Sequence, residues 1–391
     1  MNKKLIALLL ATLPAAAMAD VTLYGDIEAD VENGKALNYN QQGQNPVNGA
    51  TFSPALKTVS KIDDTGSYIG FKGNEDLGNG LKAIWQVEQG LNVDGTSGNG
   101  SGNFYGGTWA TRDTFVGLSS NFGTVKLGHI STYLNSDMEK VDPWIYGAGV
   151  NGLGTLTYND TRLKNAIRYD APQFVPGLKI SAMYGFDETR TLRADGSRSD
   201  QGQYAFGLGY ENSGFYGDLG YAAERDAGAN LNQTAYYWRA EAGYNANNLL
   251  VAAAYQQTKT YGSNATFAIQ GVGTANVAQD LANVNARING GDANGDVKQD
   301  EAALTVGYTI GAFTPMASFA WGGDVKTNGT KLNDTGYKQW VLGVNYALSK
   351  RTNSYISYGQ KKYDSGIGNV LNFANGTDKE NTVAVGLQHK F

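Results

Sequence analysis

The sequence predicts an all-β protein, a single antiparallel β-barrel of sixteen strands that crosses a membrane. Three observations lead to this fold class. Apolar side chains recur at every second position in segments of about ten residues along the whole chain. The connections between these segments alternate between short turns and long polar loops. The first and last segments of the mature chain share this alternation, so they can pair and close the sheet on itself.

Residues 1–19 have the pattern of a secretory signal peptide. Two lysines form the positive start, an apolar run covers 5–13, and Ala17-Met18-Ala19 is a small-residue cleavage site. The apolar run is shorter than the roughly 20 residues that a membrane-spanning helix needs. We therefore predict export, removal of residues 1–19 and a single mature barrel domain over residues 20–391.

Composition favours a membrane barrel over a soluble globule. The chain contains 52 glycines, 24 tyrosines and 14 phenylalanines, but only 17% charged residues and no cysteine. These proportions fit a sheet with an apolar, aromatic-rimmed outer face and a wet inner face. Without cysteine, disulfides and thiolate metal sites are excluded. The formal net charge of −5 argues against nucleic acid as a partner, because binding to phosphates requires a basic surface.

Sixteen strand-like segments follow one another along the mature chain. Several alternate cleanly, for example Leu304, Val306 and Tyr308 against Thr305 and Thr309. Most reach the about 9–11 residues that a transmembrane strand needs. The predicted strands are 20–32, 67–76, 80–90, 110–119, 123–130, 163–171, 177–187, 201–210, 215–225, 235–244, 249–259, 299–310, 313–322, 337–348, 352–363 and 381–391.

Short turns and long loops alternate strictly between the predicted strands. The turns carry Asn and Gly, which tight hairpins favour, as in Leu77-Gly78-Asn79 and Asn121-Phe122-Gly123. The loops are Gly- and Asn-rich and cover 33–66, 91–109, 131–162, 188–200, 226–234, 260–298, 323–336 and 364–380. This alternation is expected when all turns lie on one side of a membrane and all long loops lie on the other.

The last strand ends the chain on an aromatic residue. Val383, Val385 and Leu387 share one face, and Phe391 continues the same register. We predict that Phe391 anchors the outward apolar face and serves as the assembly signal of the barrel. The simpler alternative is an ordinary soluble strand that happens to end the chain.

A barrel of this size leaves an aqueous channel, because the ring of strands encloses more space than its own side chains fill. Charged residues on the predicted inward face are costly towards lipid but acceptable towards water. They are Asp26, Glu28, Asp30, Asp218, Glu224, Arg239 and Glu241. For most of them, the simplest interpretation is that they solvate the channel wall.

The loop over residues 131–160 is acidic and has basic residues on both sides. The loop acids are Asp137, Glu139 and Asp142, and the flanking bases are Arg112, Arg162, Lys164 and Arg168. By strand alternation, Lys164 and Arg168 are expected to share the lumen face with Ala166. If the loop folds into the barrel, these opposed charges form a constriction that sets ion preference. If the loop lies on the outer rim, its acids are simply solvated, and periodicity does not decide between the two.

Several sequence blocks resemble the general porins of Gram-negative bacteria, most of all the neisserial and related betaproteobacterial branch. The blocks span the mature chain and are 20–25, 69–83, 85–89, 115–118, 167–172 and 385–391. The resemblance implies a sixteen-stranded barrel, a homotrimer and a third loop that folds inwards as the constriction. It therefore favours the inward path for residues 131–160 and places Arg112 on the basic wall.

Two positions depart from the family pattern. Tyr68 and His129 stand where the family often has a basic residue. Both departures reduce the positive charge at the constriction, so the resemblance does not predict anion preference.

We therefore predict a general diffusion porin in outer-membrane lipid that passes ions and small hydrophilic solutes. No catalytic site, metal or cofactor is predicted, since the only histidines are His129 and His389 and no nucleophile with a base is evident. Two other interpretations stay open. One is a barrel that acts mainly as an adhesin towards host molecules, and the other is a channel specific for one solute.

Overall fold

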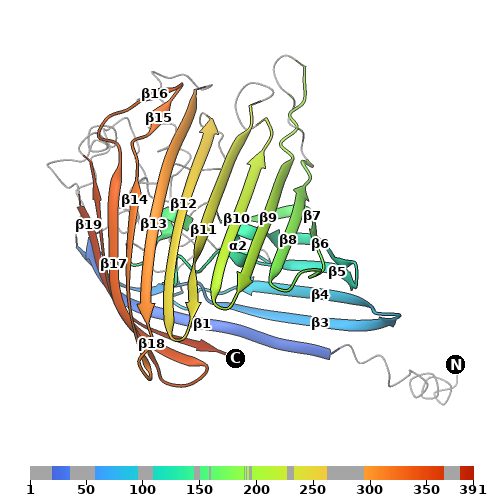
Figure 1. The fold of residues 1–391 in the computed structure, drawn as a ribbon, viewed down its shortest axis with the longest axis horizontal. Coiled ribbons are helices and arrows are strands. Elements are labelled where there is room, and N and C mark those ends of the chain that lie inside the picture. The colour runs from blue at the N-terminus through green and yellow to red at the C-terminus, as the bar shows by residue number, and fades with distance from the viewer. Residues whose placement is uncertain are drawn as a thin grey trace.

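The computed structural model describes residues 20–35, 58–95, 109–144, 150–157, 160–188, 190, 192, 196–226, 233–261, 295–364 and 379–391. In this part of the chain one antiparallel sheet closes on itself as a barrel (Figure 1). The predicted signal peptide lies outside the described residues. Among the residues described, none of the helices has the length and apolar character that crossing a membrane requires.

The predicted sixteen-stranded antiparallel barrel is confirmed. Its wall consists of β1 (Asp20–Lys35), β3 (Tyr68–Gly78), β4 (Leu81–Gly90), β5 (Thr114–Ser120), β6 (Gly123–Ser131), β7 (Arg162–Asp170), β8 (Leu178–Gly185), β9 (Gln203–Asn212), β10 (Phe215–Glu224), β11 (Ala235–Ala246), β12 (Leu249–Tyr261), β13 (Asp296–Tyr308), β14 (Phe313–Gly322), β17 (Tyr337–Ala347), β18 (Thr352–Tyr363) and β19 (Lys379–Lys390). Short strands β2 (Val59–Asp64), β15 (Lys326–Thr327) and β16 (Thr330–Lys331) extend the wall at the end that carries the long loops. The largest boundary difference is at β5, which begins at Thr114 and not at residue 110.

The barrel closes where the first strand meets the last. β1 pairs with β19 from Asp26↔Lys390 to Lys35↔Asn381, and its other edge pairs with β3 and then β2. At the seam the amide of Phe391 donates to the carbonyl of Gly25 (3.1 Å), and the amide of Gly25 donates to the carbonyl of Phe391 (3.2 Å). The Phe391 ring lies so close to Gly25 that a Cβ there would be 2.5 Å from the ring. Residue 25 must therefore be glycine for the aromatic end of the chain to fit.

The two faces of the wall carry opposite kinds of side chain, as the alternation predicts. On β19, Val385 and Leu387 are 54% and 51% exposed, whereas their neighbour Ala384 is fully buried. The charged residues predicted to face inwards are all buried: Asp26, Glu28, Asp30, Asp218, Glu224, Arg239 and Glu241. The inner surface is therefore polar, while the outer surface presents aliphatic and aromatic groups to lipid.

One expected orientation is wrong because β7 contains an irregularity. The pairing of β6 with β7 shifts between Gly128 and Ile130, and Asn165 has a positive φ of 48°. Consequently Leu163 and Ala166 are both buried on the inner face although they are three residues apart. Lys164 follows Leu163 and is exposed on the opposite side. Lys164 therefore does not share the lumen face with Ala166 and Arg168.

Loss of Phe391 is expected to impair closure of the barrel. Deletion removes the ring and both terminal hydrogen bonds, whereas Phe391→Asp removes only the ring and places a charge against the apolar seam. Both variants should give less folded, heat-modifiable protein in membrane fractions, and deletion should have the larger effect. A suitable control is Phe122→Ser, because Phe122 is 84% exposed at a turn. Wild-type yields for both Phe391 variants would contradict the seam interpretation.

Candidate channel constriction

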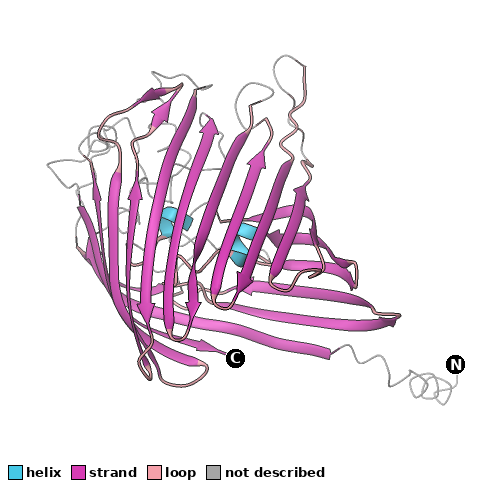
Figure 2. Cartoon of the chain, viewed as in Figure 1, coloured by secondary structure: helices cyan, strands magenta, loops and turns pink. Residues whose placement is uncertain are grey.

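The third long loop, between β6 and β7, lies inside the barrel. It contains two short helices, α2 (Tyr133–Asp137) and α3 (Gly154–Thr157). Figure 2 shows both helices against the strands of the wall, and residue contacts place α2 on β9 and β10 and α3 on β13. These contacts place the two helices against the inner face of the wall. We refer to residues 132–161 as loop 3.

The start of loop 3 fits into a groove made by glycines. The Tyr133 ring covers Gly207 and Gly209 of β9, where any added Cβ would collide with the ring. The Tyr133 hydroxyl donates to Asp218 Oδ1 of β10 at 2.5 Å. Leu134 packs in the same way on Gly220. The wall has small residues where the loop must approach its backbone closely.

A buried arginine ties both ends of loop 3 to β11. The Arg239 side chain is fully buried, and its Nη2 donates to Leu134 O (3.2 Å), Met138 O (2.9 Å) and Asp160 Oδ2 (2.6 Å). Burial raises the pKa of Asp160, while the guanidinium favours its ionised form. Because one guanidinium binds residues near each end of the loop, it holds the loop closed on itself and against the wall.

The middle of loop 3 reaches the far side of the barrel. Trp144 Nε1 donates to Ser318 Oγ of β14 at 2.8 Å, and Thr305 Oγ1 of β13 donates to Val141 O at 2.5 Å. Further along, Asn151 Nδ2 donates to Glu32 Oε1 of β1 at 3.1 Å. The loop therefore crosses the lumen from β6 to the closing seam.

Asp142, predicted as an acid of the constriction, is instead part of the packing of loop 3. Only 4% of its surface is exposed, and it accepts hydrogen bonds from Leu153 N (3.1 Å) and Thr157 Oγ1 (3.3 Å). Burial raises its pKa to about 7, although these hydrogen bonds favour the ionised form. Its carboxyl group stabilises the turn of the loop and does not face the open lumen.

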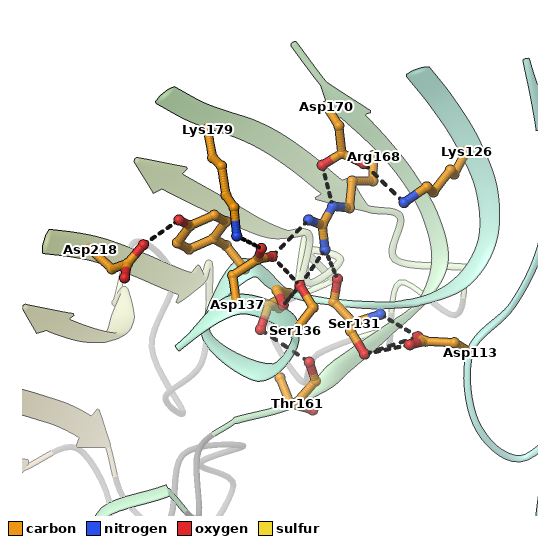
Figure 3. Close-up of polar contacts among 12 residues, drawn as sticks. Asp113, Lys126, Ser131, Ser136, Asp137, Thr161, Arg168, Asp170, Lys179 and Asp218 are labelled. Carbon is orange, nitrogen blue, oxygen red and sulfur yellow. Dashed lines mark hydrogen bonds and ion pairs between the residues drawn. The ribbon is translucent and has the colours of Figure 1, made fainter. Parts of the chain in front are cut away.

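Asp137 meets the basic wall directly, as Figure 3 shows. Its two oxygens lie 3.4 Å from Arg168 Nη2 and 3.1 Å from Lys179 Nζ. Arg168 in turn pairs with Asp170 at 2.8 Å, and Asp170 lies 3.0 Å from Lys126 Nζ. Burial would raise the pKa of Asp137, but hydrogen bonds from Ser136 and Lys179 and the charge of Arg168 outweigh it, so this pKa is lowered. The result is a ladder of alternating charges beside a cavity of about 440 Å³.

Arg168 also supports the loop backbone. Its Nη1 donates to Ser131 O at 2.7 Å and to Ser136 Oγ at 3.0 Å. It therefore acts both as a wall charge and as a support for the start of α2.

Glu139 lies on the exposed side of loop 3 and faces the other two predicted bases. The pKa of Glu139 is raised, mainly because the group is withdrawn from bulk water and also because of the charge of Asp160. The charges of Arg162 and Arg112 act in the opposite direction. Arg112 is held by Glu88 (3.5 Å) and by the face of the Tyr68 ring, 4.5 Å from the guanidinium carbon. Tyr68, at a position where the family pattern often has a basic residue, thus contacts and positions Arg112.

The structure brings together most of the residues predicted for the constriction, but not all. Asp137 meets Arg168, and Glu139 lies near Arg112 and Arg162; Arg162 also pairs with Asp113 (3.5 Å). Asp142 and Lys164 lie elsewhere. Sequence reasoning missed Lys126, Asp170, Lys179 and the anchoring role of Arg239. Lys126 and Arg168 are direct cross-strand partners, so correct strand pairing would have indicated this ladder.

The closed sheet, the polar lumen and the inward loop define an outer-membrane channel. Comparison with known proteins agrees: the family model described as Gram-negative porin matches residues 5–366. The chain belongs to the Gram-negative porin family. It is 36% identical to the major outer membrane protein P.IB of Neisseria sicca, over the full length of both chains. It therefore forms a general diffusion channel of the outer membrane.

Solved structures show the same fold at lower identity. The anion-selective porin from Comamonas acidovorans superposes with a TM-score of 0.68 and 21% identity, covering 95% of this chain and 100% of that chain. The trimer form of OmpT, an outer membrane protein of Vibrio cholerae, has a TM-score of 0.61 and 14% identity, with coverage of 95% and 99%.

Removing the charge of Arg239 is expected to loosen loop 3. Arg239→Met leaves Asp160 buried with the Tyr237 hydroxyl but without its charged partner, and breaking a buried ion pair in this way costs about 3–5 kcal/mol. Single-channel recordings should show more frequent transitions between conductance levels than the wild type.

Two further variants make this test specific. Arg239→Met combined with Asp160→Asn should recover part of the wild-type behaviour, because no buried charge is then left unpaired. Arg225→Met is the matched control, since Arg225 forms an exposed pair with Asp200 and such pairs contribute about 0–1 kcal/mol. Equal behaviour of Arg239→Met and the control would rule out the anchoring role.

Proposed function

We propose that loop 3 and the wall opposite it form a charged constriction that selects among the solutes of this diffusion channel. The observation that supports the proposal is the path of loop 3, which starts at β6 and reaches Glu32 on β1 through Asn151. Glu139 lies on the loop side, and Arg112 and Arg162 lie on the wall side, while Asp137 and Arg168 pair with each other where loop 3 meets the wall.

Opposed charges at this point produce a field across the path of a solute. Little water separates the two sides, so the field is screened less than at the rim, where the Debye length is about 8 Å at physiological salt. Cations pass nearer the loop and anions nearer the wall. The solute is transported unchanged, and the channel performs no catalysis.

The acids and bases at this constriction are closely balanced. Arg112 is paired with Glu88, Arg162 with Asp113, and Lys126 with Asp170. The sign of the preference therefore depends on a small excess on either side, and single neutralisations should be sufficient to change it.

Neutralising one side of the constriction is expected to shift ion preference towards the charge of the other side. Glu139→Gln should move the reversal potential in a salt gradient towards anions, and Arg112→Gln should move it towards cations. Planar-bilayer recordings of purified protein measure both shifts.

Two controls distinguish a local field from a general loss of charge. Asp142→Asn neutralises a carboxyl group in the same loop, but this group is buried. Asp296→Asn removes an acid from the outer face of β13. Both should shift the reversal potential much less than Glu139→Gln. Shifts of equal size in all variants would refute a constriction at loop 3.

The protein is further proposed to assemble as a homotrimer after loss of residues 1–19. The similar fold described as the trimer form of OmpT supports this assembly. A physical reason is the aliphatic outer wall near the seam, where Val31, Ile62 and Val385 are 54–60% exposed and can pack against another barrel.

Native mass measurement in mild detergent should give three copies of the mature chain and no cofactor. Mass measurement of the denatured chain should place its first residue at Asp20. A monomer as the only folded species would contradict the trimer.

A further inference from the structure

The cavity of about 440 Å³ at the start of loop 3 is lined by α2 and by the wall strands β4–β8. Phe115, Ile130 and Tyr133 give it an apolar part. Its charged lining has bases and acids in equal number, namely Lys126, Arg168 and Lys179 with Asp113, Asp137 and Asp170. A concave site of this volume is large enough to hold a small solute.

Five of these charges form a ladder of regular spacing, which Figure 3 shows. The order along the ladder is Lys126, Asp170, Arg168, Asp137 and Lys179. The successive contacts measure 3.0, 2.8, 3.4 and 3.1 Å. Because the sign alternates at each step, a solute with a single charge is attracted by one group and repelled by the next. A solute that carries both charges at the same spacing is attracted by two neighbouring groups at once.

The Lys126–Asp170 pair is the part of the ladder that a solute reaches next to an apolar surface. Arg168 is only 8% exposed, whereas the side chains of Lys126 and Asp170 are 23% and 25% exposed. The ammonium group has three N–H donors and the carboxylate about four acceptor sites, so the pair keeps hydrogen-bonding capacity for a solute. The Phe115 ring, whose centroid is 5.3 Å from Lys126 Nζ, supplies the apolar contact beside it.

We propose that the Lys126–Asp170 pair binds the zwitterion of α-amino acids. One carbon atom joins the two charged groups of an α-amino acid, which places the ammonium nitrogen about 3 Å from the carboxylate oxygens. This separation matches the spacing of the pair. The solute lies antiparallel to the pair, with its carboxylate on Lys126, its ammonium on Asp170 and its side chain on Phe115. Both polar contacts are charge-assisted hydrogen bonds.

The test measures equilibrium binding of two isomeric solutes to the folded mature protein in detergent micelles at pH 7. α-Aminobutyrate and γ-aminobutyrate have the same composition and the same two charges, but the charges of the γ isomer are farther apart. Butyrate, which lacks the ammonium group, is the third probe. Saturation-transfer NMR over a series of solute concentrations gives the dissociation constant of each probe.

The wild type should bind α-aminobutyrate about fivefold more tightly than either of the other probes, because each of these loses one of the two ion contacts. Lys126→Gln combined with Asp170→Asn removes one charge of each sign and keeps the net charge of the chain. This variant should bind α-aminobutyrate about five- to tenfold more weakly and lose the preference over the γ isomer. Lys126→Gln alone should weaken binding about threefold.

The matched control is Arg225→Gln combined with Asp200→Asn, which removes an ion pair of 2.9 Å that does not line the cavity. Its affinity for α-aminobutyrate should equal that of the wild type. Heat-modifiability on gels shows whether each variant folds. If the double variant at Lys126 and Asp170 does not fold, the result for Lys126→Gln alone decides.

Four results would overturn the proposal. They are equal affinity for the two isomers, butyrate binding as tight as that of α-aminobutyrate, unchanged affinity in the Lys126 variants, and an equal loss in the control. The inference rests on the proposed function only because the solute enters the cavity through the channel. Unchanged reversal potentials in Glu139→Gln and Arg112→Gln would contradict the charged constriction without affecting this binding measurement, so the two proposals fail separately.

Discussion

A ring of sixteen strands encloses more space than its inward side chains can fill, and the rest of the structure depends on how that space is occupied. Loop 3 fills one side of it. The result is a barrel with two different inner walls. Against the loop, Gly207, Gly209 and Gly220 allow backbone and rings to approach as closely as in a soluble core. Beside the start of the loop, Lys126 and Lys179 keep part of their side chains exposed, whereas Arg168 is buried between Asp137 and Asp170.

The packed side resembles the interior of a soluble domain. Trp144, Leu153 and Leu156 of the loop pack with wall residues of β10–β18, including Ala252 and Met316. Arg239 adds a buried charge that only one arrangement of the loop satisfies, because its donors must reach Leu134 O, Met138 O and Asp160 together. Apolar packing contributes stability here, and the buried arginine contributes specificity. The width of the opening follows from both.

The strand pattern could be predicted from the sequence because a half-buried wall imposes period-2 alternation on every strand. Local backbone irregularities are not visible in that pattern. Lys164 was expected to face the lumen. The pairing of β6 with β7 shifts at Asn165, so the residues of β7 that precede Asn165 point to the opposite face from the one that alternation predicts. An asparagine within a strand is a weak signal for such a site, since Asn tolerates positive φ. The place of Asp142 depends on the three-dimensional path of loop 3, which periodicity does not describe.

The seam has a consequence for biosynthesis. The pairing of β1 with β19 joins segments that lie far apart in the sequence. A chain that stops before β19 cannot make this pairing. A truncated chain keeps two open strand edges, which are templates for aggregation. The sheet is therefore free of open edges only in a chain that carries both strands, and the hydrogen bonds between Gly25 and Phe391 complete the ring.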